Sequence, residues 1–227
     1  MLDADVQRAF ENVLQTIRSS GVAGDSIAKA GEAVDDSRLP EIELVEVDLD
    51  FVQWEPQFRV LLQSVLAGRF GADLTRNRHQ FDPSFVQTIE NGLAHSAVEL
   101  AQAINVRTEM YRRVESLFKA VDFLITPTVA TPSVLAATDP HAPLSIAGQD
   151  CGPIRAAWYP YTFPFNLTGH PAISLPCGWA DNGLPIGLQI AGGWDAEANV
   201  LAMARWLDGA MAIERRVPML EPNPQSR

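Results

Sequence analysis

The sequence lacks several features that would place the protein in a membrane, outside the cell or on nucleic acid. It has no apolar run of membrane-spanning length. Its first residues, MLDADVQRAFENV, carry acids where a signal peptide has basic residues and an apolar run. The formal net charge of −11 disfavours binding to phosphate backbones or anionic lipid. We therefore expect a soluble, cytoplasmic protein with neither a nucleic-acid nor a membrane partner.

Residues that hold metals and cofactors are scarce as well. The two cysteines, Cys151 and Cys177, have no CxxC spacing, which favours ordinary thiols over a disulfide or a metal site. The four histidines form no HExxH motif, and the chain has no GxGxxG, GxxxxGK[ST] or GxSxG. We therefore expect no metal and no cofactor. A partnership between His170 and Ser174 is conceivable, but their positions at a turn and in a strand favour structural roles.

The residues that are present predict a globular chain, and we treat residues 1–227 as a single domain. Helical spacing of apolar residues predicts helices at about 4–19, 54–68, 83–92, 96–120 and 195–211. The second of these should end near Gly68 and Gly71. We expect Asp3, Asp82 and Asp195 to cap helices, and Ile104 and Leu201 to face inward.

Strand-like runs occupy residues 42–49, 123–127, 172–177 and 185–191. The composition predicts a loop or an insertion at 21–40, mostly loop at 132–160, and a frayed tail at 218–227. A long helix that leads directly into an apolar strand is typical of a sheet covered by helices. The short turn between the last two strands favours an antiparallel hairpin. These patterns predict an α/β fold with a mixed β-sheet flanked by helices.

Three blocks in the second half resemble the amidase signature family. They read SAVELAQAINVRTEMYRRVESLFKAVDFLITPTVA, then YTFPFNLTGHPAISLPCG, then GLPIGLQIAGGWDAEANVLAMARWL, and they cover about residues 96–207. They are similar to the carboxyl-terminal half of that family, whereas the first 95 residues resemble it only loosely. The resemblance implies the carboxyl-terminal portion of the amidase signature fold. It also implies a parent activity that hydrolyses a carboxamide to an acid and ammonia or an amine.

The resemblance further implies a triad that this sequence does not reproduce. The family uses a nucleophilic serine, a bridging serine in a cis peptide and a neutral lysine base. All three lie upstream of the matching blocks. A lysine can act as this base only when desolvation lowers its pKa. The only lysines are Lys29 and Lys119, and the pair Ser19-Ser20 precedes Lys29, the reverse of the family order. We therefore expect no catalytic residue, and a truncated or remnant chain that is inactive alone.

The part of the family's active site that the resemblance implies for this chain is one wall of the substrate pocket. The positions that would border the acyl side of the substrate are Trp158, Tyr159, Thr162, Phe163 and Asn166. Phe163 fits core packing as well as pocket lining. The sequence NLTGHP at residues 166–171 predicts a turn that depends on Gly169. The position of Gly169 between Thr168 and His170 suggests a backbone angle that residues other than glycine rarely adopt. Glutamine-using amidotransferases carry an aspartate where Tyr159 stands, which favours a plain amidase with an apolar or aromatic substrate.

Two alternatives and a partner remain open. The chain could be a non-catalytic binding module that keeps the pocket wall, or a protein like the A subunit of an amidotransferase. Its partner would be a small amide substrate in the full-length parent, together with the missing amino-terminal half or a second copy of itself. We expect a homodimer formed through unpaired strand edges at Phe123–Thr126 and Ile186–Ile190, unless the 132–160 loop shields them.

Overall fold

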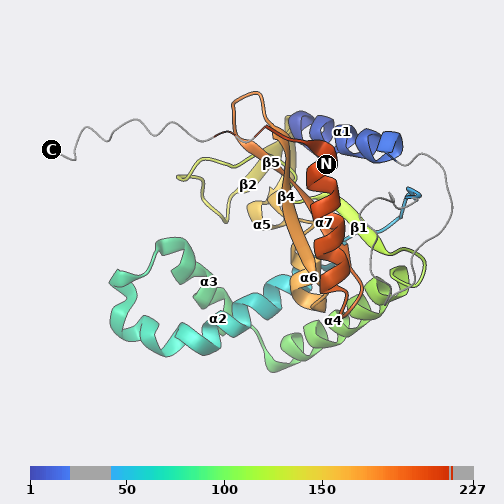
Figure 1. Ribbon diagram of the computed structural model, residues 1–227. Helices are drawn as coiled ribbons and strands as arrows, with labels where there is room; N and C mark the ends of the chain where they lie inside the picture. Colours follow the sequence, from blue (N-terminus) through green and yellow to red (C-terminus); the bar gives the residue numbers. More distant parts are fainter. Residues whose placement is uncertain (21–41, 215, 217–227) are drawn as a thin grey trace.

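A computed structural model describes residues 1–20, 42–214 and 216 of the chain (Figure 1). The 21–40 segment, Lys29 and the 218–227 tail lie outside the described residues. The helices are α1 (Ala4–Ser20), η1 (Val52–Trp54), α2 (Glu55–Asn77), η2 (Arg78–Gln80), α3 (Pro83–Ala94), α4 (Ala97–Leu117), α5 (Ile154–Trp158), α6 (Phe163–Thr168) and α7 (Glu197–Met211). The strands are β1 (Phe123–Pro127), β2 (Pro143–Ile146), β3 (Gln149–Pro153), β4 (Ala172–Trp179) and β5 (Pro185–Gly192).

The main sheet has three strands in the order β1-β5-β4. Both of its pairings are antiparallel, with Ile125 opposite Ile190 and Ile173 opposite Ile190. The α/β fold class is confirmed, and so is the β4–β5 hairpin. The parallel pair that a mixed sheet needs does not occur among the described strands, because β1 meets β5 in the antiparallel sense.

Helices α1 and α7 cover one face of this sheet (Figure 1). Alternate residues of a strand point to opposite faces, so Ile186, Leu188 and Ile190 of β5 all reach this side. They pack against Val13 of α1 and Leu207 of α7 in the largest buried cluster of the described chain. The other face meets α4 and α6 through a second cluster, in which Ala191 of the sheet contacts aromatic side chains.

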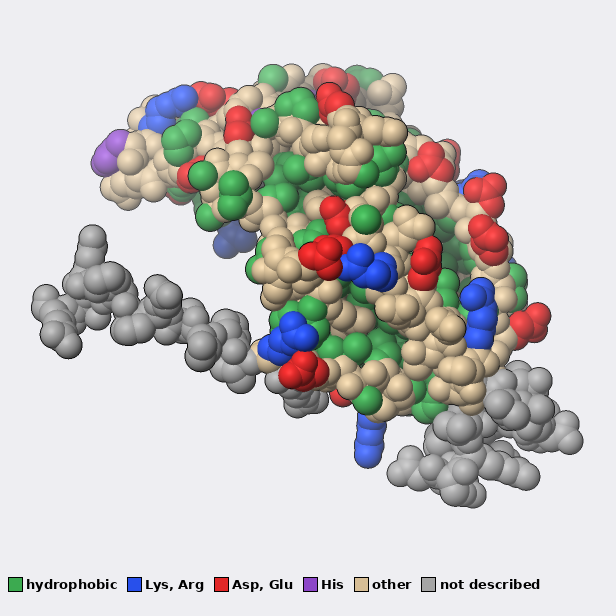
Figure 2. All heavy atoms as spheres, turned by 90° about the horizontal axis from the view of Figure 1, so that it is seen from above, with side chains coloured by type: hydrophobic (Ala, Val, Ile, Leu, Met, Phe, Trp, Pro, Cys, Tyr) green, Lys and Arg blue, Asp and Glu red, His purple; other side chains and the backbone are tan. Residues whose placement is uncertain are grey.

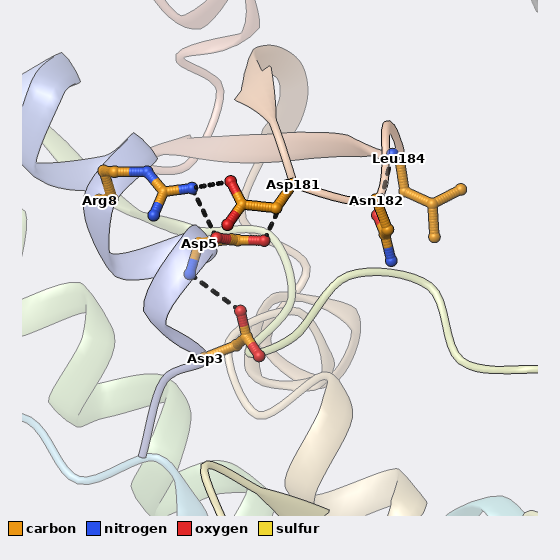
Figure 3. A network of polar contacts seen from close by, with 6 residues as sticks. All are labelled: Asp3, Asp5, Arg8, Asp181, Asn182 and Leu184. Carbon is orange, nitrogen blue, oxygen red and sulfur yellow. Dashed lines mark hydrogen bonds and ion pairs between the residues drawn. The ribbon is translucent and has the colours of Figure 1, made fainter.

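The start of α1 is tied to the turn between β4 and β5 (Figure 3). The Asp3 carboxylate accepts the backbone N–H of Asp5 at 2.9 Å, which confirms the predicted cap. The Arg8 guanidinium bridges Asp5 and Asp181 at 2.6 and 2.7 Å. The side chains of Arg8 and Asp181 are exposed and that of Asp5 is partly buried, so the network aligns α1 with the hairpin and contributes little stability.

Two further helices begin close to their predicted starts, and each has a side-chain cap. The Asp82 carboxylate accepts the backbone N–H of Ser84, with Pro83 in the first turn of α3. Ser96 and Glu99 form a reciprocal capping box at the start of α4. Local side-chain chemistry therefore sets both boundaries.

Other expectations for the helices are wrong. α2 continues through Gly68 and Gly71 to Asn77, because packing against α3 outweighs the roughly 1 kcal/mol that a helical glycine costs. α7 begins at Glu197, and Asp195 does not cap it but takes a left-handed conformation with φ 61°. Ile104 and Leu201 are exposed on the outer sides of their helices.

Residues 42–49 were expected to form a strand, and this expectation is also wrong. They form no ladder with any described strand, although Ile42 and Leu44 pack on the α1 side of the sheet and Leu49 on the other. Alternating apolar residues indicate which side chains are buried, but a strand also needs a partner for its N–H and C=O groups.

The 132–160 segment contains more structure than the predicted loop. β2 and β3 form an antiparallel hairpin joined at Ala147 and Gly148, with φ of 51° and 78°, and α5 follows directly. Two successive positive φ values match the tight turns of hairpins, where alanine is rare, so the turn was easily missed.

One of the two strand edges expected to pair with another chain is not an edge. Ile186–Ile190 lies in β5, which is paired on both sides, whereas β1 is paired on one side within the described residues. The dimer itself stays a prediction. Among the described helices, none is both long and apolar enough to cross a membrane.

Candidate functional site

The predicted pocket wall is attached to the chain that follows β1. The Trp158 carbonyl accepts the backbone N–H of Ala130 at 2.7 Å, and its indole N–H donates to the Thr131 carbonyl at 3.0 Å. Trp158 ends α5 and is partly exposed. The segment that begins at Trp158 therefore lies beside the carboxyl end of β1.

A buried glutamine makes the second connection between this segment and the sheet. The Gln189 side-chain amide donates to the Thr126 hydroxyl at 3.1 Å and to the Tyr161 carbonyl at 2.8 Å. Gln189 is 5% exposed and sits in the central strand β5. A buried amide with its donors satisfied holds its partners in one arrangement, so Tyr161 is anchored to the middle of the sheet.

The five predicted wall residues have different surroundings. Tyr159 and Trp158 lie with their rings 6.2 Å apart and are both partly exposed, and the Thr162 hydroxyl donates to the Tyr159 carbonyl. Phe163 has no exposed surface and stacks on Phe58 at 5.0 Å, so it supports the wall from behind. Asn166 is exposed. Contact of these residues with a substrate stays a prediction.

A pair of hydroxyl groups completes the polar row on this face of the sheet. The Thr128 and Ser174 oxygens lie 2.6 Å apart, above Gly187 of the intervening strand. A Cβ on Gly187 would lie 2.8 Å from the Thr128 oxygen and 3.0 Å from that of Ser174, so only glycine leaves room for the pair. Sequence reasoning missed this row of Thr126, Thr128, Ser174 and Gln189, because it depends on the register of three strands.

The turn between α6 and β4 confirms the expectation for Gly169. This residue ends α6 with φ 76° and donates its N–H to the Phe165 carbonyl. A left-handed residue directly after a helix is most easily a glycine. The turn directs the next side chain, His170, into the protein.

His170 lies buried among aromatic rings. Its Nε2 lies 3.0 Å from the Glu115 carboxylate and its Nδ1 lies 2.8 Å from the Thr168 hydroxyl. A carboxylate only accepts hydrogen bonds, so Nε2 carries the proton and Nδ1 accepts from Thr168. Burial lowers the pKa of His170, and the Glu115 carboxylate opposes that shift. The imidazole therefore ties α4 to the turn.

The described residues contain no activated nucleophile. Ser174 is hydrogen-bonded to Thr128 and His170 to Glu115 and Thr168, so the conceivable His170–Ser174 pair is not formed. Burial raises the pKa of the Cys177 thiol to about 12, which leaves no thiolate at neutral pH. Both cysteines are free.

The other candidates offer no site either. The Ser19 hydroxyl donates to the Thr16 carbonyl at the end of α1, and Lys119 is exposed just after α4. Over residues 1–20 and 42–214, no three His, Cys, Asp or Glu side chains gather as a metal ion would need.

Comparison with known proteins identifies the family. The family model described as Amidase matches residues 1–201, which is most of the chain and includes the amino-terminal part whose resemblance was loose. The chain belongs to the Amidase family. Its partly exposed wall beside β1 and the polar row can now be considered as parts of an amidase fold.

Relatives with known names are similar over about half of this chain. The A subunit of glutamyl-tRNA(Gln) amidotransferase from Synechococcus sp. (strain CC9902) is 37% identical over 125 residues, which are 55% of this chain and 22% of that protein. The protein of the same name from Thermodesulfovibrio yellowstonii is 35% identical over 119 residues, 52% of this chain and 23% of that protein.

Solved structures share the fold over nearly the whole chain. An amidase crystal structure has a TM-score of 0.75 at 22% identity, and a bacterial aryl acylamidase of the amidase signature family has a TM-score of 0.70 at 20% identity. Each likeness covers 92% of this chain, but only 42% and 41% of the other. The chain therefore spans less than half the length of the proteins it matches.

Proposed function

We propose that this chain forms part of an amidase that hydrolyses a carboxamide to an acid and ammonia or an amine. The match to the Amidase family over residues 1–201 carries the proposal. Among the described residues, no serine hydroxyl is hydrogen-bonded to a lysine or a histidine, and the order of Ser19-Ser20 and Lys29 is the reverse of the family's. We therefore place the nucleophile and the base in a segment outside this sequence. By itself the chain is inactive and contributes one wall of the site.

The segment from Trp158 to Asn166 is that wall. Two observations support this role: its attachment to the end of β1 through Trp158, and the anchor that Gln189 gives to Tyr161. The partly exposed rings of Trp158 and Tyr159 suit an apolar or aromatic acyl group. Phe163 would act indirectly, by holding the backbone in place.

The first test is an assay of ammonia release by the purified chain on simple aliphatic and aryl amides. We expect no turnover above a buffer control. Turnover that Ser20→Ala or Lys29→Ala abolishes would place a catalytic pair inside this sequence and contradict the proposal. Loss on Ser174→Ala or His170→Ala would contradict it in a different way, by reviving a serine–histidine pair.

The second test asks where the catalytic groups come from. The DNA upstream of Met1 should contain, in frame, a GGSSGG-type segment preceded by a lysine codon, and the extended protein should hydrolyse amides. If no such segment exists and no separate chain restores activity, a non-catalytic binding module is the better explanation.

A second candidate function is that of an amidotransferase component. The 37% identity to the A subunit of glutamyl-tRNA(Gln) amidotransferase favours it, whereas Tyr159 stands where glutamine-using amidotransferases carry an aspartate. The extended protein can be compared on glutamine and on an aryl amide, with Tyr159→Asp as the matched variant. A preference for the aryl amide that Tyr159→Asp shifts toward glutamine supports the plain amidase; a wild-type preference for glutamine supports the amidotransferase.

A further inference from the structure

The helices α2 and α3 form an arm that projects from the sheet (Figure 1). At the end of this arm lies an open hollow of about 900 Å³, between the last turn of α2, η2 and the start of α3. Its lining includes Arg76, Arg78, His79, Phe81, Val86 and Gln87. Figure 2 shows a histidine and a basic side chain close together at this end of the molecule, with acidic side chains nearby.

The hollow carries positive charge in an acidic protein. The chain has a formal net charge of −11, yet the charged lining residues are two arginines and one glutamate, in addition to His79. Arg78 is paired with Glu90, and neither Arg76 nor His79 has a hydrogen bond or ion pair within the described part of the chain. The exposed guanidinium of Arg76, in the same lining as the apolar surface of Phe81, is suited to a ligand that brings both carboxylates and carbon.

The arm is rigid enough to present this surface in one shape. A Cβ on Gly92 of α3 would overlap the Gln63 carbonyl of α2, so the two helices are packed backbone against backbone. The rings of Phe70, Phe81 and Phe85 meet at centroid distances of 5.4 to 6.4 Å under the hollow. A preorganised surface loses little entropy on binding.

We infer that the hollow at the end of the arm binds an acidic peptide segment of another protein. The argument is charge complementarity: arginine forks bind carboxylates, and a peptide with successive acidic residues can reach Arg76 and Gln87 while its carbon atoms contact Phe81. At about 900 Å³ the hollow is larger than a single small anion requires, and few charged side chains line it. The contact is therefore weak and salt-sensitive.

The test is fluorescence anisotropy with a labelled hexaglutamate peptide at low ionic strength. Wild-type chain should bind it, and Arg76→Glu should weaken binding by about tenfold or more, as expected for the loss of a charge-assisted hydrogen bond. The matched control is Arg112→Glu on the exposed side of α4, which changes the net charge equally at a position outside the hollow. The control should bind like wild type.

Three results would overturn the inference. The first is no binding by wild type at millimolar peptide, and the second is equal weakening by Arg76→Glu and Arg112→Glu, which would indicate a general charge effect. The third is a dimer in sedimentation that Arg76→Glu dissociates, because the occupant would then be a second copy of this chain. Arg76 is exposed, so we expect unchanged unfolding midpoints for both variants.

Discussion

The two faces of the β1-β5-β4 sheet differ in chemistry, although alternate residues of the same three strands build both. Toward α1 and α7 the strands present large apolar side chains such as Leu188 and Ile190, both fully buried. Toward the predicted wall they present Thr126, Gln189 and Ser174, and the Ser174 hydroxyl is hydrogen-bonded to that of Thr128 just after β1. The apolar face therefore stabilises the fold through buried side chains, whereas the polar face holds neighbouring chain segments in place through hydrogen bonds.

The largest effect should follow from emptying the apolar face. Leu188→Ala is expected to reduce the free energy of unfolding by about 2–5 kcal/mol, because Leu188 is fully buried and its loss leaves a cavity. Chemical denaturation measures the change. The control is Leu201→Ala on α7, where the leucine is 60% exposed, and it should be nearly neutral. Equal losses in the two variants would show that this face does not dominate stability.

A smaller loss is expected from crowding the polar face. Gly187→Ala places a methyl group against the Thr128 and Ser174 oxygens and should cost about 1–3 kcal/mol. Gly68→Ala is the matched control, since nothing lies within 4 Å of its Cβ position and alanine favours a helix; it should stabilise by about 0.5–1 kcal/mol. Destabilisation by Gly187→Ala should shrink in a Ser174→Ala background if the hydroxyl contact is its cause.

The turn that leads into β4 should respond to backbone angle alone. Gly169→Ala is expected to cost about 1 kcal/mol or more, because φ is 76° while the nearest side-chain atom, on Trp194, is at an ordinary 3.5 Å. Gly169→Asn should cost less, since asparagine tolerates the left-handed region. An unchanged unfolding midpoint in Gly169→Ala would refute this explanation.

The smallest expected effect is a pH dependence of the free energy of unfolding that comes from His170. Because burial lowers the pKa of His170, the unfolded chain binds more protons than the folded one below the usual histidine pKa of about 6.5. Stability should therefore fall as pH drops from that value through the lower folded pKa. His170→Gln should flatten this part of the stability profile, because the shifted group is then absent. Identical profiles for wild type and His170→Gln would show that His170 is not responsible.

Local signals predicted most helices, and they failed where distant packing decides. α3 begins at the predicted Asp82 cap, and α4 begins near its predicted start, where Ser96 and Glu99 form a capping box. Such caps act within one turn of a helix. Gly68 did not end α2, since α3 packs along it. Residues 42–49 did not form a strand, although apolar and polar residues alternate there. A strand must pair with a second strand, and the alternation does not specify which one.

By itself, the sequence determined the family, the starts of α1, α3 and α4, and the special backbone angle at Gly169, because each depends on a short run of residues. Only the tertiary structure decided which groups meet on the sheet. Thr128 and Ser174 are 46 residues apart and His170 and Glu115 are 55 apart, and each pair depends on strand register or on the docking of α4. A shift of register by one residue would turn Ser174 to the opposite face. The chemistry of the polar face is therefore set by pairing between distant strands. The free energy of that pairing comes from many contacts between residues far apart in the sequence, and no short run of residues specifies them.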